Sequence, residues 1–146
     1  SEYIFYSNVQ KNMKKLFFAL FLAFSASICA SKPWKLHLKE PKMKIELKID
    51  LYEESIEVPD MEMFGPMNGY LGGNIYSVWP VTSFKIKKDK VILRLSNDLG
   101  SETQEAELTQ TSDSTYTLKL IGSTVVKKVE GRKLVKITPI LNMIKQ

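Results

Sequence analysis

Cysteine and histidine are almost absent from this 146-residue chain, which contains one of each, Cys29 and His37. A Cys/His or Ser/His/Asp arrangement would have to use His37 as its base, and no Gly-x-Ser-x-Gly elbow accompanies it. A zinc site is equally poorly supported, because structural zinc sites take about four Cys or His ligands. We therefore expect no catalytic residues, no metal site and no cofactor, and we expect the protein not to be an enzyme.

Acidic residues are the remaining candidates for catalysis. They occur together at Glu53-Glu54, at Asp60 with Glu62, and at Glu102 with Glu105 and Glu107. Solvated charges on turns and strand faces are the simpler interpretation. Glycosidase-type acids can come from distant positions in a sequence, so a carboxylate hydrolase stays an open alternative.

The chain also lacks a strong excess of charge of one sign. Its formal net charge is +5, of which three lysines against Glu2 supply +2 within residues 1–30. That leaves +3 for residues 31–146, spread over the predicted strands. Nucleic-acid-binding domains usually gather Lys and Arg on one face, so we expect no nucleic-acid partner.

No apolar run is long enough to span a bilayer, which takes about 20 residues. The run Leu16–Phe24 follows Met13-Lys-Lys and precedes small residues that end at Ala30. A positive start, a short apolar centre and a small-residue end are typical of a signal peptide. We therefore expect residues 13–30 to be a signal peptide and residues 1–12 to be an upstream extension that is not native.

The mature chain would then be one domain, residues 31–146, with no transmembrane segment and a periplasmic or secreted location. Cleavage after Ala30 leaves no cysteine, so no disulfide forms and stability must come from a hydrophobic core. The alternative is a lipoprotein anchored through Cys29, although Ile28 stands where a lipobox usually has a small residue.

Helical periodicity is missing after the signal peptide. Every second residue from Met43 to Leu51 is apolar, and those between are Lys, Glu or Asp, which is the period of a strand with one buried face. Similar stretches follow between turn residues, for about eight to ten short strands in all. This predicts an all-β fold, an antiparallel up-and-down barrel or half-open barrel, with a last strand at residues 134–138 and a short tail at residues 140–146.

Residues 59–80 do not follow this rhythm. They hold four of the seven glycines and three of the six prolines, and their turn dipeptides predict an irregular, apolar lid or crossover. Methionine side chains adapt to apolar ligands, and the mouth of a small barrel can hold one. The candidate ligand-binding residues are Met61, Met63, Phe64, Met67, Tyr70, Tyr76 and Trp79. Alternatively, these side chains plug the end of the barrel.

The signal peptide, the tryptophan at the start of the first strand (Trp34) and the meander of short amphipathic strands resemble the lipocalin-like or calycin-like small exported domains common in Bacteroidetes. Lipocalins usually carry Gly-x-Trp before the first strand, and the run here is Lys32-Pro33-Trp34, so only the packing role of Trp34 is carried over. The resemblance implies a β-barrel over residues 31–138 with a site for a small apolar molecule.

Two functions follow, and the sequence does not choose between them. In the first, the protein is an exported, lipocalin-like binding protein for a small apolar ligand, gated by the segment 61–79. In the second, it is an interaction module of the cell envelope, an inhibitor or assembly partner that binds a protein and no small molecule.

Overall fold

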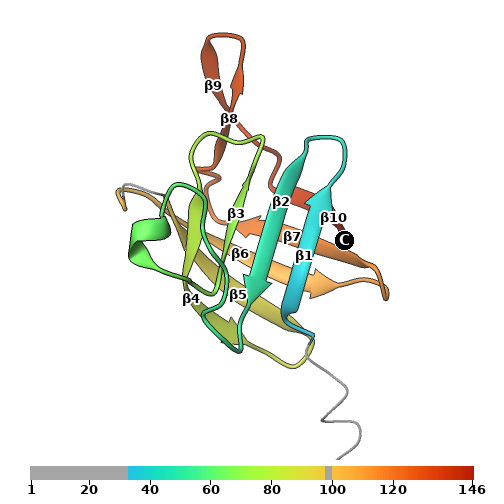
Figure 1. The fold of residues 1–146 in the computed structure, drawn as a ribbon. Coiled ribbons are helices and arrows are strands. Elements are labelled where there is room, and N and C mark those ends of the chain that lie inside the picture. The colour runs from blue at the N-terminus through green and yellow to red at the C-terminus, as the bar shows by residue number, and fades with distance from the viewer. Residues whose placement is uncertain (1–32, 98–99) are drawn as a thin grey trace, which may run out of the picture. The chain divides into compact units, whose positions relative to one another are not determined.

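The computed structural model describes residues 33–97 and 100–146, which form ten β-strands and one short 3-10 helix (Figure 1). The strands are β1 (Lys35–Glu40), β2 (Ile45–Asp50), β3 (Gly69–Gly73), β4 (Trp79–Ile86), β5 (Lys90–Ser96), β6 (Thr103–Gln110), β7 (Thr115–Ile121), β8 (Lys127–Glu130), β9 (Lys133–Lys136) and β10 (Ile140–Lys145), and the 3-10 helix η1 is Glu62–Phe64. No helix in this described part is long and apolar enough to cross a membrane. The predicted signal peptide, residues 13–30, and the extension before it lie outside the described residues.

Eight of the strands close into a barrel. Going around it, the order is β1, β2, β3, β4, β5, β6, β7 and β10, and β10 returns to pair with β1. Every neighbouring pair is antiparallel. The prediction of an all-β antiparallel barrel is thus confirmed, and the barrel is closed rather than half-open.

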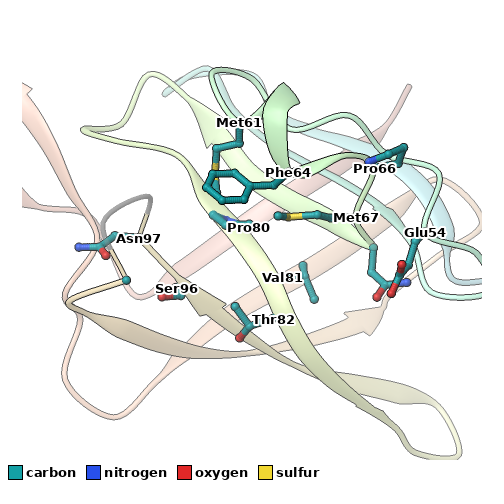
Figure 2. Close-up of a pocket in the computed structure, with 12 residues that line it drawn as sticks. Glu54, Met61, Phe64, Pro66, Met67, Pro80, Val81, Thr82, Ser96 and Asn97 are labelled. Carbon is teal, nitrogen blue, oxygen red and sulfur yellow. The ribbon is translucent and has the colours of Figure 1, made fainter.

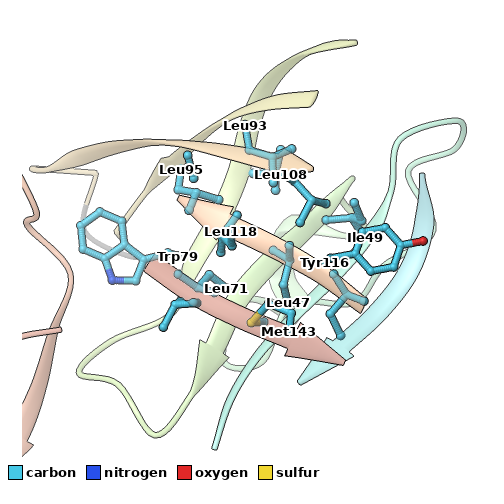
Figure 3. Packing of buried hydrophobic residues seen from close by; sticks show 14 of the residues in the cluster. Leu47, Ile49, Leu71, Trp79, Leu93, Leu95, Leu108, Tyr116, Leu118 and Met143 are labelled. Atoms are coloured by element: carbon cyan, nitrogen blue, oxygen red, sulfur yellow. The ribbon is translucent and has the colours of Figure 1, made fainter. Parts of the chain in front are cut away.

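The alternation seen in the sequence builds the interior of the barrel. Leu36 and Leu38 of β1 stand opposite Ile49 and Leu47 of β2, and all four side chains are buried. Buried residues from all eight barrel strands join them in one continuous cluster (Figure 3). Burial of apolar surface contributes about 25 cal/mol per Å², so this cluster is the main source of stability in the described domain.

Strand β3 lies where the glycine-rich sequence predicted part of a lid, so that part of the prediction is wrong. Gly69 and Gly73 have φ angles of 151° and 91°. A Cβ atom on Gly69 would overlap the carbonyl oxygen of Lys48, and one on Gly73 would overlap that of Lys44. These glycines therefore mark a close approach of two backbones rather than turns, and Leu71 between them points into the core.

The C-terminal region differs from the prediction as well. Strand β9, which overlaps the predicted last strand at residues 134–138, pairs with β8 in a separate two-stranded hairpin. The predicted tail at residues 140–146 is instead the strand that closes the barrel. Leu141 and Met143 of β10 point inward and are buried, so this short segment has the same two-residue rhythm as the other barrel strands.

Residues 51–68 leave the barrel between β2 and β3, and Asp50 holds the point of departure. Its carboxylate accepts hydrogen bonds from the Tyr52 and Glu53 N–H groups, each at 3.1 Å, and from the Ser55 hydroxyl at 2.7 Å. Burial by itself raises the pKa of the Asp50 carboxyl, but these hydrogen bonds outweigh it and hold the pKa below its ordinary value.

This departing segment packs on the outside of the barrel. A second small cluster consists of Ile56, Val58, Met61 and Tyr70. Tyr70 faces outward because side chains alternate along β3 and its neighbour Leu71 faces the core. A single antiparallel bridge joins Ile56 to Met67 within this segment.

Candidate functional site

One pocket, about 530 Å³ in volume, lies between residues 51–68 and β4 (Figure 2). We call it the methionine pocket. Met61, Phe64 and Met67 lie on one side of it, and Pro80 and Val81 of β4 lie across from them. Its polar lining residues are Glu54, Asn68, Thr82, Ser96 and Asn97. Thioether and aromatic side chains of this kind repack around apolar groups of different shapes.

The second pocket, about 390 Å³ in volume, lies where the connection between β3 and β4 meets the base of the β8–β9 hairpin. We call it the Trp79 pocket. Its apolar walls are Tyr76, Trp79, Val125 and Leu134, and its polar lining residues are Ser77, Asn97, Glu102 and Lys127. Ligand sites of about 300–1,000 Å³ with apolar walls and a few polar groups are the usual form of a small-molecule site.

Hydrogen bonds between distant segments hold the Trp79 pocket in shape. The Tyr76 N–H donates to the Lys127 carbonyl oxygen at 2.7 Å. The Val125 N–H donates to Oε1 of Gln104 at 2.9 Å. Gln104 is buried, and its amide also donates to the Ile121 carbonyl oxygen at 3.1 Å. The connection between β3 and β4 is therefore tied to the hairpin, and the segment that precedes the hairpin is tied to β6 of the barrel.

Trp79 is the unusual residue of this pocket. It lies at one end of the core cluster (Figure 3), and only 2% of its surface is exposed. No atom of residues 33–97 or 100–146 accepts a hydrogen bond from its buried Nε1. Most buried donors have a partner, and one without a partner costs about 1–3 kcal/mol.

The structure divides the seven candidate residues. Met61, Phe64 and Met67 line the methionine pocket, and Tyr76 and Trp79 line the Trp79 pocket. Met63 and Tyr70 line neither, since Met63 is exposed on η1 and Tyr70 is buried in the outer cluster. Because β3 separates the two groups, the segment 61–79 contributes to two pockets rather than to one.

The rest of the Trp79 pocket comes from the C-terminal half of the chain, and the sequence interpretation missed it. Val125, Lys127 and Leu134 meet Tyr76 only because the hairpin starts beside the connection between β3 and β4. The only local sign of a pocket residue in this region is Leu134, an apolar residue in a basic stretch. It does not indicate which distant residues it contacts.

A row of polar side chains crosses the outer faces of β1, β2 and β3. His37 Nε2 lies 3.0 Å from Glu46 Oε2, and the Tyr70 hydroxyl donates to Glu46 Oε1 at 3.1 Å. Burial raises the pKa of Glu46, but the hydrogen bonds from His37 and Tyr70 outweigh it and leave the pKa below its usual value. Burial and the Glu46 charge raise the pKa of Tyr70 to about 12. The row therefore joins three strands through the protonated Tyr70 hydroxyl, the ionised Glu46 carboxylate and the His37 imidazole. None of these three residues lines either pocket.

Acidic and metal-binding groups are sparse around the two pockets. The methionine pocket has one carboxylate in its lining, Glu54, and the Trp79 pocket has one, Glu102. A carboxylate hydrolase requires two acids that face one cleft, and neither lining supplies the pair. Within residues 33–97 and 100–146, no three His, Cys, Asp or Glu side chains are grouped so that they would hold a metal ion.

Comparisons of the chain with models of known protein families, with curated proteins and with solved structures found no match. The closed barrel is therefore a conclusion from this structure alone, and the lipocalin-like resemblance stays a prediction.

Proposed function

We propose that this protein binds a small, mainly apolar molecule that carries a hydrogen-bond acceptor, and that the ligand occupies the Trp79 pocket. The observation that supports this is that Trp79 is one of the lining residues of this pocket and that its buried Nε1 has no acceptor in the described part of the chain. Because Nε1 is buried, the pocket wall has to shift for a ligand oxygen to reach it. That oxygen would then provide the acceptor, and the bound state would gain the free energy that the unpaired donor costs.

The other walls fit a mainly apolar ligand. Tyr76 is exposed although it is large and mainly apolar, and a ligand in the pocket would cover it. Each Å² of apolar surface removed from water contributes about 25 cal/mol. Lys127 attracts an acidic acceptor and Glu102 repels one, so a fatty acid and its neutral ester are the two probes to compare.

The experiment is a titration of a fluorescent fatty acid, and of its methyl ester, into the wild type, Trp79→Phe and Trp34→Phe. Phenylalanine keeps an aromatic ring at either position and removes the indole N–H of that position. Trp34 is also buried but lines neither pocket, which makes it the matched control. We expect Trp79→Phe to weaken binding about 5- to 150-fold, the equivalent of the roughly 1–3 kcal/mol that the unpaired donor costs, and Trp34→Phe to leave it unchanged. Equal effects of the two substitutions, or binding of neither probe, would contradict the proposal.

We propose that this binding takes place outside the cytoplasm, because the sequence predicts export with cleavage after Ala30. The alternative is a lipoprotein that keeps Cys29. The intact mass of the exported protein distinguishes a chain that begins at Ser31 from one that begins with a lipidated Cys29.

A second candidate, a protein-interaction module, is favoured by a different observation. Met63 and Phe64 on η1 are 86% and 65% exposed, and Phe64 also borders the methionine pocket. An apolar side chain of a partner protein would cover both residues. A partner that is retained by the wild type and Trp79→Phe, and lost with the double substitution Met63→Ser/Phe64→Ser, would support this function over the first.

A further inference from the structure

The net positive charge of residues 31–146 is concentrated on one hairpin. Residues 127–136, which form β8, the turn and β9, contain five basic residues against the single acidic Glu130, a formal charge of +4. The whole chain has a formal charge of +5. The surplus that the sequence interpretation took as spread over the strands is therefore gathered on these ten residues.

This hairpin projects from the barrel. Its two strands pair only with each other, and in Figure 1 they extend beyond the end of the barrel, away from the turn between β4 and β5. The turn and all of β9 are exposed. The base of the hairpin is held by the hydrogen bond from the Tyr76 N–H to the Lys127 carbonyl oxygen, so the hairpin presents its exposed turn and β9 at a fixed place on the domain.

Apolar side chains lie among these charges. Val129 pairs with Leu134, so the two share one face of the hairpin, and they are 60% and 47% exposed. Lys127 and Lys136, the next pair on the same face, flank them. The arrangement is an exposed apolar pair beside basic residues, with Arg132 in the turn.

We propose that the β8–β9 hairpin docks on the surface of an anionic phospholipid bilayer. The basic residues lie at the level of the lipid phosphates, and Val129 and Leu134 enter the boundary between headgroups and acyl chains. Polybasic segments bind anionic membranes through the summed attraction of single charges, and a second, apolar contribution makes such binding stable.

The same charge would also attract nucleic acid, but the rest of the hairpin favours lipid. Residues 127–136 contain no aromatic side chain, so they offer no platform on which bases could stack. Two exposed aliphatic side chains beside the basic residues are of little use against phosphates in water and are suited to an acyl-chain boundary.

The experiment measures flotation of the purified protein with vesicles of phosphatidylcholine, with or without phosphatidylglycerol. The test variant is Arg132→Ala/Lys133→Ala. The matched control is Lys87→Ala/Lys88→Ala, which removes two exposed lysines from the turn between β4 and β5. We expect the wild type and the control to bind the anionic vesicles and not the neutral ones. Each basic residue near such a surface strengthens binding about 5-fold, so the test variant should bind roughly 25-fold more weakly than the wild type.

A third variant, Val129→Ser/Leu134→Ser, separates insertion from charge. With insertion, this variant is released from anionic vesicles at a salt concentration that still retains the wild type, since exposed charges are screened by salt. All of these substitutions lie outside the barrel, and an unchanged unfolding midpoint shows that the barrel is intact.

Three results would overturn the proposal: equal loss in the test variant and the control, equal binding to neutral and anionic vesicles, or displacement of the protein from the vesicles by a short DNA duplex at equal phosphate concentration. The first would mean that net charge alone attracts the protein, and the last would favour nucleic acid.

Discussion

Gly69→Ala is the sharpest test of how β3 joins the barrel wall. Gly69 is paired with Ile49 of β2 and has a φ angle of 151°. An added Cβ would overlap the Lys48 carbonyl oxygen and lie 2.8 Å from the Cα of Ile49. Both of these are backbone atoms of β2, so no side-chain rotation relieves the overlap.

The cost has two contributions. A positive φ angle costs a residue with a Cβ about 1–2 kcal/mol, and overpacking against a rigid neighbour costs about 1–3 kcal/mol. We therefore expect Gly69→Ala to lower the free energy of unfolding by about 2–5 kcal/mol, a large part of the roughly 5–15 kcal/mol that keeps a domain folded. Gly122→Ala is the matched control, because Gly122 has a φ angle of 75° but no described atom within 4 Å of the added Cβ. Its cost should be only the backbone contribution, about 1–2 kcal/mol.

Urea unfolding followed by tryptophan fluorescence measures both variants against the wild type. Equal losses for Gly69→Ala and Gly122→Ala would refute the close approach of β3 to β2. A stable Gly69→Ala variant would also favour the irregular lid or crossover that the glycines predicted for residues 69–73.

Three further predictions concern packing and ionisation. Leu141→Ala should lower the free energy of unfolding by about 2–5 kcal/mol, because Leu141 is 0% exposed in the closing strand. The control Ile140→Ala, at a 51% exposed position, should change it by about 0.5 kcal/mol. Similar urea midpoints for the two variants would argue against closure of the barrel by β10. Asp50 has a lower pKa in the folded than in the unfolded chain, so it stabilises the fold above the ordinary aspartate pKa of about 4 and this contribution is lost as the pH falls through the folded-state pKa. The deficit of Asp50→Asn, about 1.5–3 kcal/mol at neutral pH, should therefore shrink in acid, and a deficit independent of pH would contradict this. Tyr70 should ionise with a pKa of about 12 in a tyrosinate absorbance titration, and Glu46→Gln should lower that pKa because it removes the neighbouring charge.

The sequence predicts well those parts of the fold in which the polarity of each residue matches its burial. Residues 43–51 alternate strictly, and β2 has the buried face that this alternation predicts. Strand β3 was missed because glycine is ambiguous: the same residue permits a turn and permits two backbones to approach. Strand β10 was missed because its pairing with β1 joins residues about a hundred positions apart, and six residues after a proline carry no sign of that partner.

The candidate site was predictable to a similar extent. Tyr76 and Trp79 stood out by residue type, and the structure places both in one pocket. Val125 and Leu134 did not stand out, because their role depends on where the hairpin leaves the barrel. Met63 is of a residue type that often binds apolar ligands, but it lines neither pocket. Residue type thus indicated part of the site, but which residues line the pocket depends on contacts between distant segments.

The most direct test of the proposed site is the nitrogen–proton NMR spectrum of the labelled protein during titration with the fatty acid or its ester. The chain has two tryptophans, so the spectrum has two indole signals, and Trp34 serves as the internal reference. Formation of a hydrogen bond from Trp79 Nε1 to the ligand predicts a downfield shift of its indole proton with a saturable dependence on probe concentration, while the Trp34 signal stays in place. Saturable probe binding that leaves the Trp79 signal unmoved, or that shifts Trp34 instead, would contradict the assignment of the ligand site to this pocket.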